Sequence, residues 1–441
     1  MFTITDFGAV PDGTTNNAPA IMRAIRSCHA AGGGVVRVPA GAFFSGTIRL
    51  LSGVELHLEE GAHLIGSLDP EEIENTPSPD SQVKDVSGFF IGAFGAKDVA
   101  ITGKGVIDGQ GERVFFEDGS DEGTGEGPKM SSGFRPRMFS LEGVKGLRVE
   151  GVTIQDSPLW TLHLAGCEDV LIRGVTIRND PRGTNNDGID PDACKRVLIE
   201  DCDITSGDDA ITIKCSKSSF EQYGPCEDIE IRNCRLASHD SAVKIGTENT
   251  GDVRRVHVHH CEIRDCSRAF TVLARDGGTV EDIHVHHLTG AVRAYHGAGN
   301  RAFMPDWWGK GEAFCLSATP RPGKTGCAGH IQNVRLEDCD LAVESSVFLA
   351  GEEESLLEAI TLRDIRLTFR RQGTQEPGTF DEQPSGRGKY AHIVPALYAR
   401  RVKGLVTENV SVCYNGEANA WQRVCQAEDC EEADVSGVRF V

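Results

Sequence analysis

Short stretches of alternating apolar and polar residues return many times along this chain. Each copy consists of an apolar residue, any residue, a second apolar residue, any residue, a small or polar residue, and an apolar residue again. The small or polar position of the copies is occupied by Gly151, Gly174, Asp201, Asn233, His260, His287, Asp338, Asp364 and Asn409. Because alternation with a period of two is typical of β-strands, each copy predicts one strand followed by a turn.

The spacing of the copies indicates the fold class. The first six copies lie 23, 27, 32, 27 and 27 residues apart, and the later gaps of 51, 26 and 45 residues leave room for insertions. No helical run separates these strands, so they are not strand–helix–strand units, and their spacing is too wide and regular for hairpins. We therefore expect an all-β fold, a right-handed parallel β-helix in which each copy belongs to one coil.

Cysteines and histidines also recur at fixed places in the pattern. A cysteine directly follows the small or polar position at Cys202, Cys234, Cys261 and Cys339. Equal places stack in a parallel coil, so these thiols predict an interior ladder of small apolar side chains rather than a metal site. The H-x-H-H runs at 257–260 and 284–287 stack in the same way, and we interpret them as a solvated strand face rather than a zinc site.

The segment 17–31 is the one clear helical pattern near the start. Asn17 is a candidate N-cap, Pro19 falls in the first turn, and residues 32–34 are three glycines that stop the helix. One face would carry Ile21, Ala24, Ile25 and Cys28. Since an exposed β-helix end must be covered, we expect a short N-terminal capping helix.

Two segments interrupt the repeats. Residues 109–136 are rich in glycine and acidic residues, and residues 372–388 are rich in glycine, proline and glutamine. Both predict long loops over the coil, and loops on such a scaffold often wall a binding cleft. Neither has the length or composition of a linker, so we treat 1–441 as a single domain.

Charge and cysteine content limit the expected binding partners and the expected cellular location. The formal net charge of −21 argues against nucleic acids and anionic membranes as partners. The start has no basic segment followed by an apolar one, and no run of about 18 apolar residues occurs. The fifteen cysteines lack the spacing of a disulfide framework. These features predict a cytoplasmic protein, or an extracellular one if a leader preceded this sequence.

Three carboxylates flank the predicted strand 197–204. Asp187 belongs to N-N-D-G-I-D, and the adjacent pair Asp208 and Asp209 belongs to S-G-D-D-A-I-T-I-K. A single Asp-Gly step would usually be only a turn. If the two motifs close successive coils, however, the three acids stack on one surface, where like charges raise one pKa. Hydrolysis of a glycosidic bond uses one carboxyl group that donates a proton and a second that activates water.

The order of the motifs DFGAVPDG, AGGGVVRVPAG, GVIDGQG, NNDGID, SGDDAITIK and KIGTE resembles glycoside hydrolase family 28, the family of polygalacturonases and rhamnogalacturonan hydrolases. The resemblance implies a pectin-lyase-like β-helix, hydrolysis with inversion, no cofactor and no metal. It also implies that Asp208 is the general acid, that Asp187 and Asp209 activate water, and that Asn185 and Lys214 help to hold them. An inverting mechanism leads us to expect about 6.5–9.5 Å between acid and base.

Two departures from the family pattern bear on the substrate. The family histidine position falls on Asp240 or Ser241, with His239 just upstream as a candidate for its role. The family Arg-x-Lys pair that grips a galacturonate carboxylate falls on Thr271 and Leu273. Neither residue offers a charge-assisted bond, which favours a neutral sugar such as rhamnose over galacturonate at the cleavage subsite.

Further candidates for sugar contacts are Lys244, Glu248, Arg268, Arg275, Trp307, Trp308 and Lys310. The two arginines could grip a uronate from other positions. The tryptophan pair could form a stacking platform or, equally, a buried hydrophobic anchor.

These observations predict an inverting glycoside hydrolase that acts on pectin-derived oligosaccharides. Action from a chain end follows from the expected location, because an intracellular enzyme meets imported fragments rather than polymer. Two alternatives remain: a polysaccharide lyase or epimerase on the same coil, for which calcium and an Arg or Lys base are expected, and a non-catalytic carbohydrate-binding coil.

Overall fold

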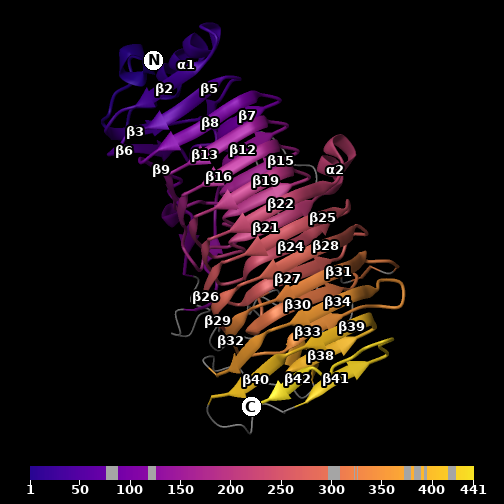
Figure 1. Cartoon of the computed structure of the whole chain (residues 1–441). Helices are drawn as coiled ribbons and strands as arrows, with labels where there is room; N and C mark the ends of the chain where they lie inside the picture. The colour runs from indigo at the N-terminus through magenta and orange to yellow at the C-terminus, as the bar shows by residue number, and fades with distance from the viewer. Residues whose placement is uncertain are drawn as a thin grey trace.

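The computed structural model describes residues 1–75, 88–117, 126–295, 308–321, 323–324, 326–371, 379–381, 389–391, 395–415 and 424–441. Three long parallel sheets wind together from the N-terminal end to the C-terminal end (Figure 1). Successive coils each add one strand to each sheet. The prediction of a right-handed parallel β-helix is therefore confirmed.

The strands of each sheet follow one another along the coil axis. Sheet A contains β1 (Phe2–Thr3), β2 (Gly34–Val38), β5 (Val54–Leu58), β8 (Lys97–Gly103), β13 (Lys145–Glu150), β16 (Glu168–Arg173), β19 (Lys195–Glu200), β22 (Cys226–Arg232), β25 (Val253–His259), β28 (Thr279–His286), β31 (His330–Glu337), β34 (Leu357–Arg363) and β39 (Val402–Glu408). Sheet B contains β3 (Gly41–Ser45), β6 (Ala62–Gly66), β9 (Val106–Asp108), β14 (Thr153–Gln155), β17 (Thr176–Arg178), β20 (Asp203–Ser206), β23 (Arg235–Ser238), β26 (Glu262–Cys266), β29 (Thr289–Val292), β32 (Asp340–Val343), β35 (Arg366–Phe369), β40 (Val410–Tyr414) and β42 (Val438–Phe440). Sheet C contains β4 (Ile48–Arg49), β7 (Phe89–Phe94), β12 (Arg137–Glu142), β15 (Leu162–Ala165), β18 (Ile189–Asp192), β21 (Ile211–Cys215), β24 (Ser241–Asn249), β27 (Arg268–Ala274), β30 (Glu312–Ala318), β33 (Val347–Ala350), β38 (Leu397–Arg400) and β41 (Cys425–Glu428).

The small or polar position of the repeat is the turn from a sheet A strand to a sheet B strand. All nine of these residues, from Gly151 to Asn409, have φ between 49° and 75°. That left-handed conformation is strained for most side chains and is best tolerated by Gly, Asn and Asp. The turn therefore explains why the pattern places small or polar residues there.

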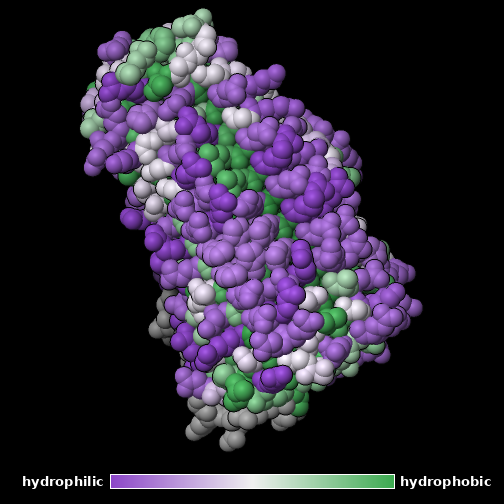
Figure 2. Space-filling view, viewed as in Figure 1, coloured by the Kyte–Doolittle hydropathy of each residue, from purple (hydrophilic) through white to green (hydrophobic). Residues whose placement is uncertain are grey.

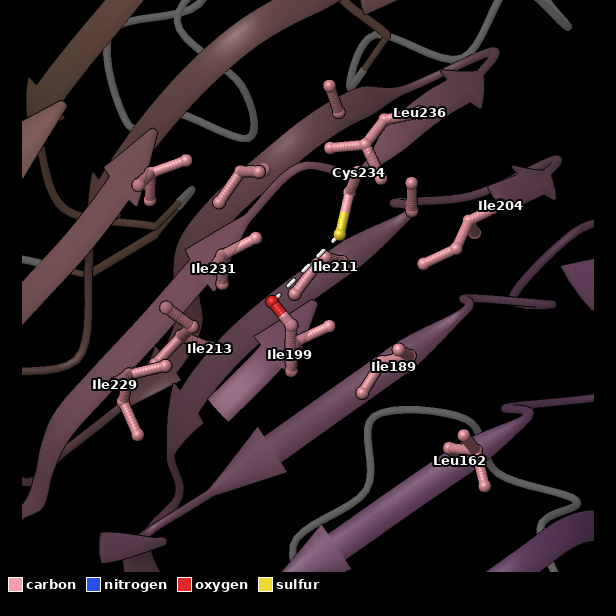
Figure 3. Packing of buried hydrophobic residues seen from close by; sticks show 14 of the residues in the cluster. Leu162, Ile189, Ile199, Ile204, Ile211, Ile213, Ile229, Ile231, Cys234 and Leu236 are labelled. Atoms are coloured by element: carbon pink, nitrogen blue, oxygen red, sulfur yellow. Dashed lines mark hydrogen bonds between the residues drawn. The ribbon is translucent and has the colours of Figure 1, made fainter. Parts of the chain in front are cut away.

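The interior of the coil is filled by stacked apolar side chains (Figure 3). Leu162, Ile189 and Ile211 occupy equal positions on β15, β18 and β21. Burial of one such side chain stabilises the fold by about 1.5–3 kcal/mol. The predicted cysteine ladder is confirmed, since Cys202, Cys234, Cys261 and Cys339 are each at most 2% exposed. The Cys234 thiol lies 3.9 Å from the Ile199 carbonyl oxygen of the preceding coil.

Helix α1 (Ala18–Ala30) covers the N-terminal end, where it packs on β1, β2, β4 and β5. Its predicted apolar face is buried. Asn17 occupies the N-cap position, but its side chain does not cap the helix. Its Oδ1 instead accepts from the Val10 amide at 2.7 Å, and its Nδ2 donates to the Phe44 carbonyl at 3.0 Å. Asn17 therefore ties the start of the helix to the first coil.

The two predicted long loops contain short hairpins, which the sequence analysis did not foresee. In the first, η2 (Gly111–Arg113) precedes β10 (Phe115–Phe116), which pairs antiparallel with β11 (Met130–Ser131). In the second, β36 (Thr379–Asp381) pairs antiparallel with β37 (Lys389–Ala391). Residues 118–125, 372–378 and 382–388 of these segments lie outside the described residues.

The remaining elements are η1 (Ile4–Phe7) and α2 (Lys217–Tyr223), which follows β21. Within the described part of the chain, no helix has the length and apolar character needed to span a membrane. Hydrophilic residues cover most of the middle coils on the face shown in Figure 2.

Candidate active site

The three predicted catalytic acids lie in sheet B to sheet C turns of two successive coils. Asp187 lies between β17 and β18, and Asp208 and Asp209 lie between β20 and β21. The Gly188 amide donates to the Asp209 carbonyl at 3.0 Å, which joins the two turns. One carboxylate oxygen from each acid lies within 4.8 Å of the others. The repeat thus brings the three acids together, as the spacing predicted.

Asn186 locks the two turns to each other. Its Oδ1 accepts from the amides of Gly207 at 2.8 Å and Asp208 at 3.2 Å, and its Nδ2 donates to the Asp180 carbonyl at 2.8 Å. Asn186 is fully buried, whereas the predicted Asn185 is partly exposed with a φ of 56°. The sequence analysis singled out the first asparagine of N-N-D-G, but the second one makes this connection.

Asp209 forms a buried ion pair with Lys244. The Lys244 Nζ donates to Asp209 Oδ2 at 2.6 Å, and the Ser241 amide donates to Oδ1 at 3.2 Å. Asp209 is 1% exposed and Lys244 is 7% exposed, so water screens this interaction little. Both contacts therefore fix the position of the Asp209 carboxylate.

The other two acids favour the protonated form. Burial raises the pKa of Asp208 well above its usual range, and the charges of Asp187 and Asp209 raise it further, while Lys244 opposes the shift. Burial and the nearby Asp190 likewise raise the pKa of Asp187. A protonated carboxyl beside an ionised one is the pairing that general acid–base catalysis requires.

Asp190 is a fourth acid, which the sequence analysis quoted within its motif but did not single out. It is fully buried, and neither carboxylate oxygen has a hydrogen-bond partner among the described residues. Burial raises its pKa to about 8, helped by Asp209 and Asp208 and opposed by Lys214. Asp190 therefore stores a proton beside the three acids near neutral pH.

Lys214 borders the acids on sheet C. Its Nζ lies 3.1 Å from Glu248 Oε2 and 5.2 Å from the centre of the Trp160 ring. The Arg137 guanidinium lies 5.7 Å from the same ring and 3.1 Å from His163 Nδ1. The Trp160 ring therefore has two neighbouring cations, Lys214 and Arg137.

The imidazole of His163 is neutral. Burial, Arg137 and Lys214 lower the pKa of His163 well below its usual range, so its Nδ1 can accept from Arg137. The alternating repeat along the chain marks only the sheet A strands. It therefore gave no sign of Trp160, His163 and Arg137, which lie on or next to sheet C strands. The register in sheet C, where His163 pairs with Asp190, would have placed His163 beside the acids.

His239 belongs to an aromatic cluster in the turn between β23 and β24. Its ring stacks on Tyr295 with centroids 3.8 Å apart and meets the edge of Trp308 at 5.4 Å. Burial and the nearby Arg293 and Arg182 lower the pKa of His239 to about 4. Its Nδ1 is buried without a hydrogen-bond partner among the described residues.

One of the two members of the candidate tryptophan platform, Trp308, lies within the described residues. Trp308 is 4% exposed, so it anchors its segment rather than offering a face to a sugar. Trp307 lies outside the described residues. Lys310 is partly exposed, and its backbone amide donates to Glu312 Oε2 at 2.5 Å.

The two candidate arginines are buried and do not face an open cleft. Arg268 is 1% exposed and lies 3.1 Å from Asp240 Oδ1 and 3.7 Å from Glu312 Oε2. Arg275 is 4% exposed and donates to both the carbonyl and the hydroxyl of Thr319. The suggestion from sequence that these guanidinium groups could grip a uronate stays a prediction, and within the protein they contact Asp240, Glu312 and Thr319.

The positions of the family Arg-x-Lys pair are also buried. Thr271 lies beside Lys244 in the register of sheet C, and its hydroxyl donates to Ser241 Oγ at 3.3 Å. Leu273 is 1% exposed. Neither supplies a positive charge, which agrees with the sequence analysis.

The expected gap of about 6.5–9.5 Å is a separation between carboxyl groups and stays a prediction. The nearest carboxylate oxygens of the three acids lie closer, within 4.8 Å of one another. The reason is that Asp208 and Asp209 are adjacent and Asp187 stacks directly on their turn. Three such carboxylates could also hold a hard cation such as Ca²⁺. Lys244 already supplies a positive charge to Asp209.

Comparisons with known proteins agree with this arrangement. The model of the family "Glycosyl hydrolases family 28" matches residues 28–289, which include all three acids. A probable polygalacturonase of Vitis vinifera is 33% identical over 270 residues, 57% of this chain and 52% of that protein. An endo-polygalacturonase of Pectobacterium carotovorum subsp. carotovorum is 29% identical over 214 residues, 46% of this chain and 52% of that protein. The chain spans about half the length of the curated relatives it matches.

Solved structures show the same fold. A Yersinia enterocolitica family 28 exopolygalacturonase aligns with a TM-score of 0.75 at 16% identity, over 99% of this chain and 78% of that chain. A Thermotoga maritima exopolygalacturonase aligns with a TM-score of 0.60 at 23% identity, over 93% of this chain and 86% of that chain. At these identities the likeness shows the fold alone.

Proposed function

Because this chain belongs to glycosyl hydrolases family 28, we propose that it hydrolyses glycosidic bonds in pectin-derived oligosaccharides. The observation that carries the proposal is the position of a proton-holding Asp208 beside Asp209, which forms an ion pair with Lys244. Asp208 donates its proton to the glycosidic oxygen as the bond to the leaving sugar breaks. Asp209 and Asp187 orient a water, and Asp209 takes its proton as the water attacks the anomeric carbon with inversion.

The electrostatics of the site favour a neutral sugar, such as rhamnose, at the cleavage subsite. The cations nearest the acids already have carboxylate partners: Lys214 pairs with Glu248, and Lys244 pairs with Asp209 and Asp240. A galacturonate carboxylate would compete with these partners and meet the negative field of the acids. A desolvated carboxylate without its own cation is unfavourable.

Action from a chain end in the cytoplasm is part of the same proposal. All fifteen cysteines carry free thiols, which supports a reducing compartment. An enzyme there acts on imported fragments, so short oligosaccharides are the expected substrates.

The test is a panel of pectic oligosaccharides that end in either rhamnose or galacturonate, each offered to the wild type and to Asp208→Asn. We expect terminal rhamnose to be released by the wild type and not by the variant. Faster release of galacturonate would overturn the neutral subsite, and mid-chain cleavage of polymer would overturn end action. Equal product from the variant would overturn the role of Asp208.

The lyase alternative rests on the same three carboxylates, since their oxygens could bind Ca²⁺. A lyase forms an unsaturated product that absorbs ultraviolet light and is expected to need its calcium. Activity that resists a chelator and produces no such absorbance excludes it.

A further inference from the structure

A cluster of imidazoles lies on sheet A, away from the sheet B to sheet C turns that carry the acids. Strands β25 and β28 pair so that His257 lies opposite His284 and His259 lies opposite His286. The His257 and His284 rings stack with centroids 5.1 Å apart, and the His259 and His286 rings stack at 5.0 Å. All four side chains are partly buried. The rings stack coil on coil, as the sequence predicted.

His257 is the centre of this cluster. Its Nε2 lies 2.8 Å from His286 Nε2, and ligand nitrogens of His257, His284 and His286 all lie within 4.8 Å of one another. His257 also belongs to a second such group, with His259 and Glu230. Three imidazoles from two coils therefore converge on one small volume.

The distance between the two Nε2 atoms fits two ligands of one metal ion. Metal–nitrogen bonds of about 2.0–2.1 Å that meet at a right angle place the two nitrogens about 2.9 Å apart. Right angles between neighbouring ligands are typical of octahedral and square-planar ions such as Ni²⁺ and Cu²⁺. Zn²⁺, which prefers tetrahedral angles, would require the rings to separate slightly.

The surroundings resemble those of metal-binding histidines. Glu337 Oε2 lies 2.9 Å from His284 Nε2, and Arg363 lies 2.7 Å from the other carboxylate oxygen of Glu337. A carboxylate on one imidazole nitrogen orients the ring and leaves the other nitrogen for a metal. A groove of about 380 Å³ that His257 and His284 help to line gives access from solvent.

We propose that His257, His284 and His286 bind a divalent late transition-metal ion, with Glu337 as the carboxylate that orients His284. The ion links β25 to β28 and so fastens two successive coils on sheet A. It takes no part in the proposed hydrolysis, because the acids lie in turns on another edge of the coil.

The test uses full-length protein without a polyhistidine tag, freed of metal by a chelator that is then removed, with its thiols blocked by iodoacetamide. Blocking is needed because Cys327 is exposed and lies 3.5 Å from His330 Nε2. Titration calorimetry with Ni²⁺ should show one equivalent bound, and the melting temperature should rise with added Ni²⁺. The Cu²⁺ form should show nitrogen hyperfine coupling in its electron paramagnetic resonance spectrum.

Matched variants locate the ion. His257→Gln and His286→Gln should abolish binding, and Glu337→Gln should weaken it by about 10- to 100-fold, the usual effect of losing an outer-shell partner. Two controls should bind as the wild type does: His29→Gln, whose imidazole bonds to the Ser52 carbonyl instead, and Asp208→Asn, which tests the acid cluster. Circular dichroism of the metal-free variants verifies folding.

Two outcomes would overturn the proposal. One is the absence of stoichiometric binding in the wild type. The other is binding at the wrong place: Ni²⁺ binding that survives in each of His257→Gln and His286→Gln, or that is lost in Asp208→Asn.

Discussion

Lys244 reaches from its own coil to the preceding one and bonds to Asp209, with 2.6 Å between Nζ and Oδ2. The same ammonium lies 3.6 Å from Asp240 Oδ2. Asp208, the residue before Asp209, has its pKa raised by burial and by the neighbouring acids. Two adjacent carboxyl groups thus have different surroundings, one with a raised pKa and one in an ion pair, and the proposed hydrolysis uses this difference.

The first prediction concerns Asp208. Asp208→Asn keeps the size of the side chain but removes the proton that the leaving group needs, so kcat should fall by about 10²- to 10⁴-fold. Binding of an oligosaccharide, followed by calorimetry, should change little. Asp203→Asn, in the same coil and paired only with exposed arginines, is the control and should keep full activity. Equal losses in both variants would argue against a specific role for Asp208.

The second prediction concerns Lys244. Lys244→Met leaves Asp209 buried without its cation, whereas Asp240 keeps Arg268, and removing one partner of a buried ion pair destabilises a protein by about 3–5 kcal/mol. Urea denaturation should show this loss, and hydrolysis should fall with it. Lys145→Met removes an exposed ammonium 3.3 Å from Glu168 and should change stability by no more than about 1 kcal/mol. Similar losses of stability in the two variants would contradict the claim that the buried pair of Lys244 and Asp209 stabilises the fold.

The third prediction concerns pH and Asp190. Its folded-state pKa of about 8 lies above the unfolded value of about 3.9. Between these values the folded state binds a proton that the unfolded state lacks. The stabilising contribution of this group is therefore complete below about pH 4 and is lost as pH rises towards 8, by up to about 1.4 kcal/mol per pH unit.

Asp190→Asn removes this titration. As pH rises from 5 to 8, the free energy of unfolding of the variant, measured in urea, should increase relative to that of the wild type. A difference between variant and wild type that stays constant with pH would show that Asp190 does not hold a proton in the folded state.

The fourth prediction concerns the turn that defines the repeat. Asn233 has a φ of 54°, where a β-branched residue is strained. Asn233→Val should lower the free energy of unfolding by about 1–2 kcal/mol, whereas Asn233→Gly should change it by less than about 0.5 kcal/mol. Thermal and urea denaturation of both variants provide the comparison. Equal effects of valine and glycine would show that backbone conformation does not select the residue at this turn.

The coil could be predicted because its signal is local and repeated. Every turn such as that at Asn233 imposes the same backbone conformation, and every following cysteine enters the same interior ladder. The convergence of Asp187 with Asp208 and Asp209 follows from that repeat, because the two turns occupy the same place in successive coils.

The partners of the acids depend on register and burial, which no single motif encodes. Lys244 and Arg268 were both candidates from sequence, but Lys244 bonds to Asp209, one of the proposed catalytic acids, whereas Arg268 is buried against Asp240 and Glu312. Trp160 and His163 were missed because sheet C was not aligned coil by coil. The separation of the acids was predicted from mechanism rather than from the chain, and the structure gives the distance between their nearest oxygens, which is within 4.8 Å.

The most direct measurement is proton NMR of the first product released from a pectic oligosaccharide, with Asp208→Asn as the blank. The proposed water attack, guided by Asp187 and Asp209, predicts a new reducing end whose anomeric configuration is opposite to that of the bond cleaved, and no product from the blank. A product of retained configuration or one with a new carbon–carbon double bond would contradict the account, as would cleavage that proceeds unchanged without the Asp208 carboxyl group.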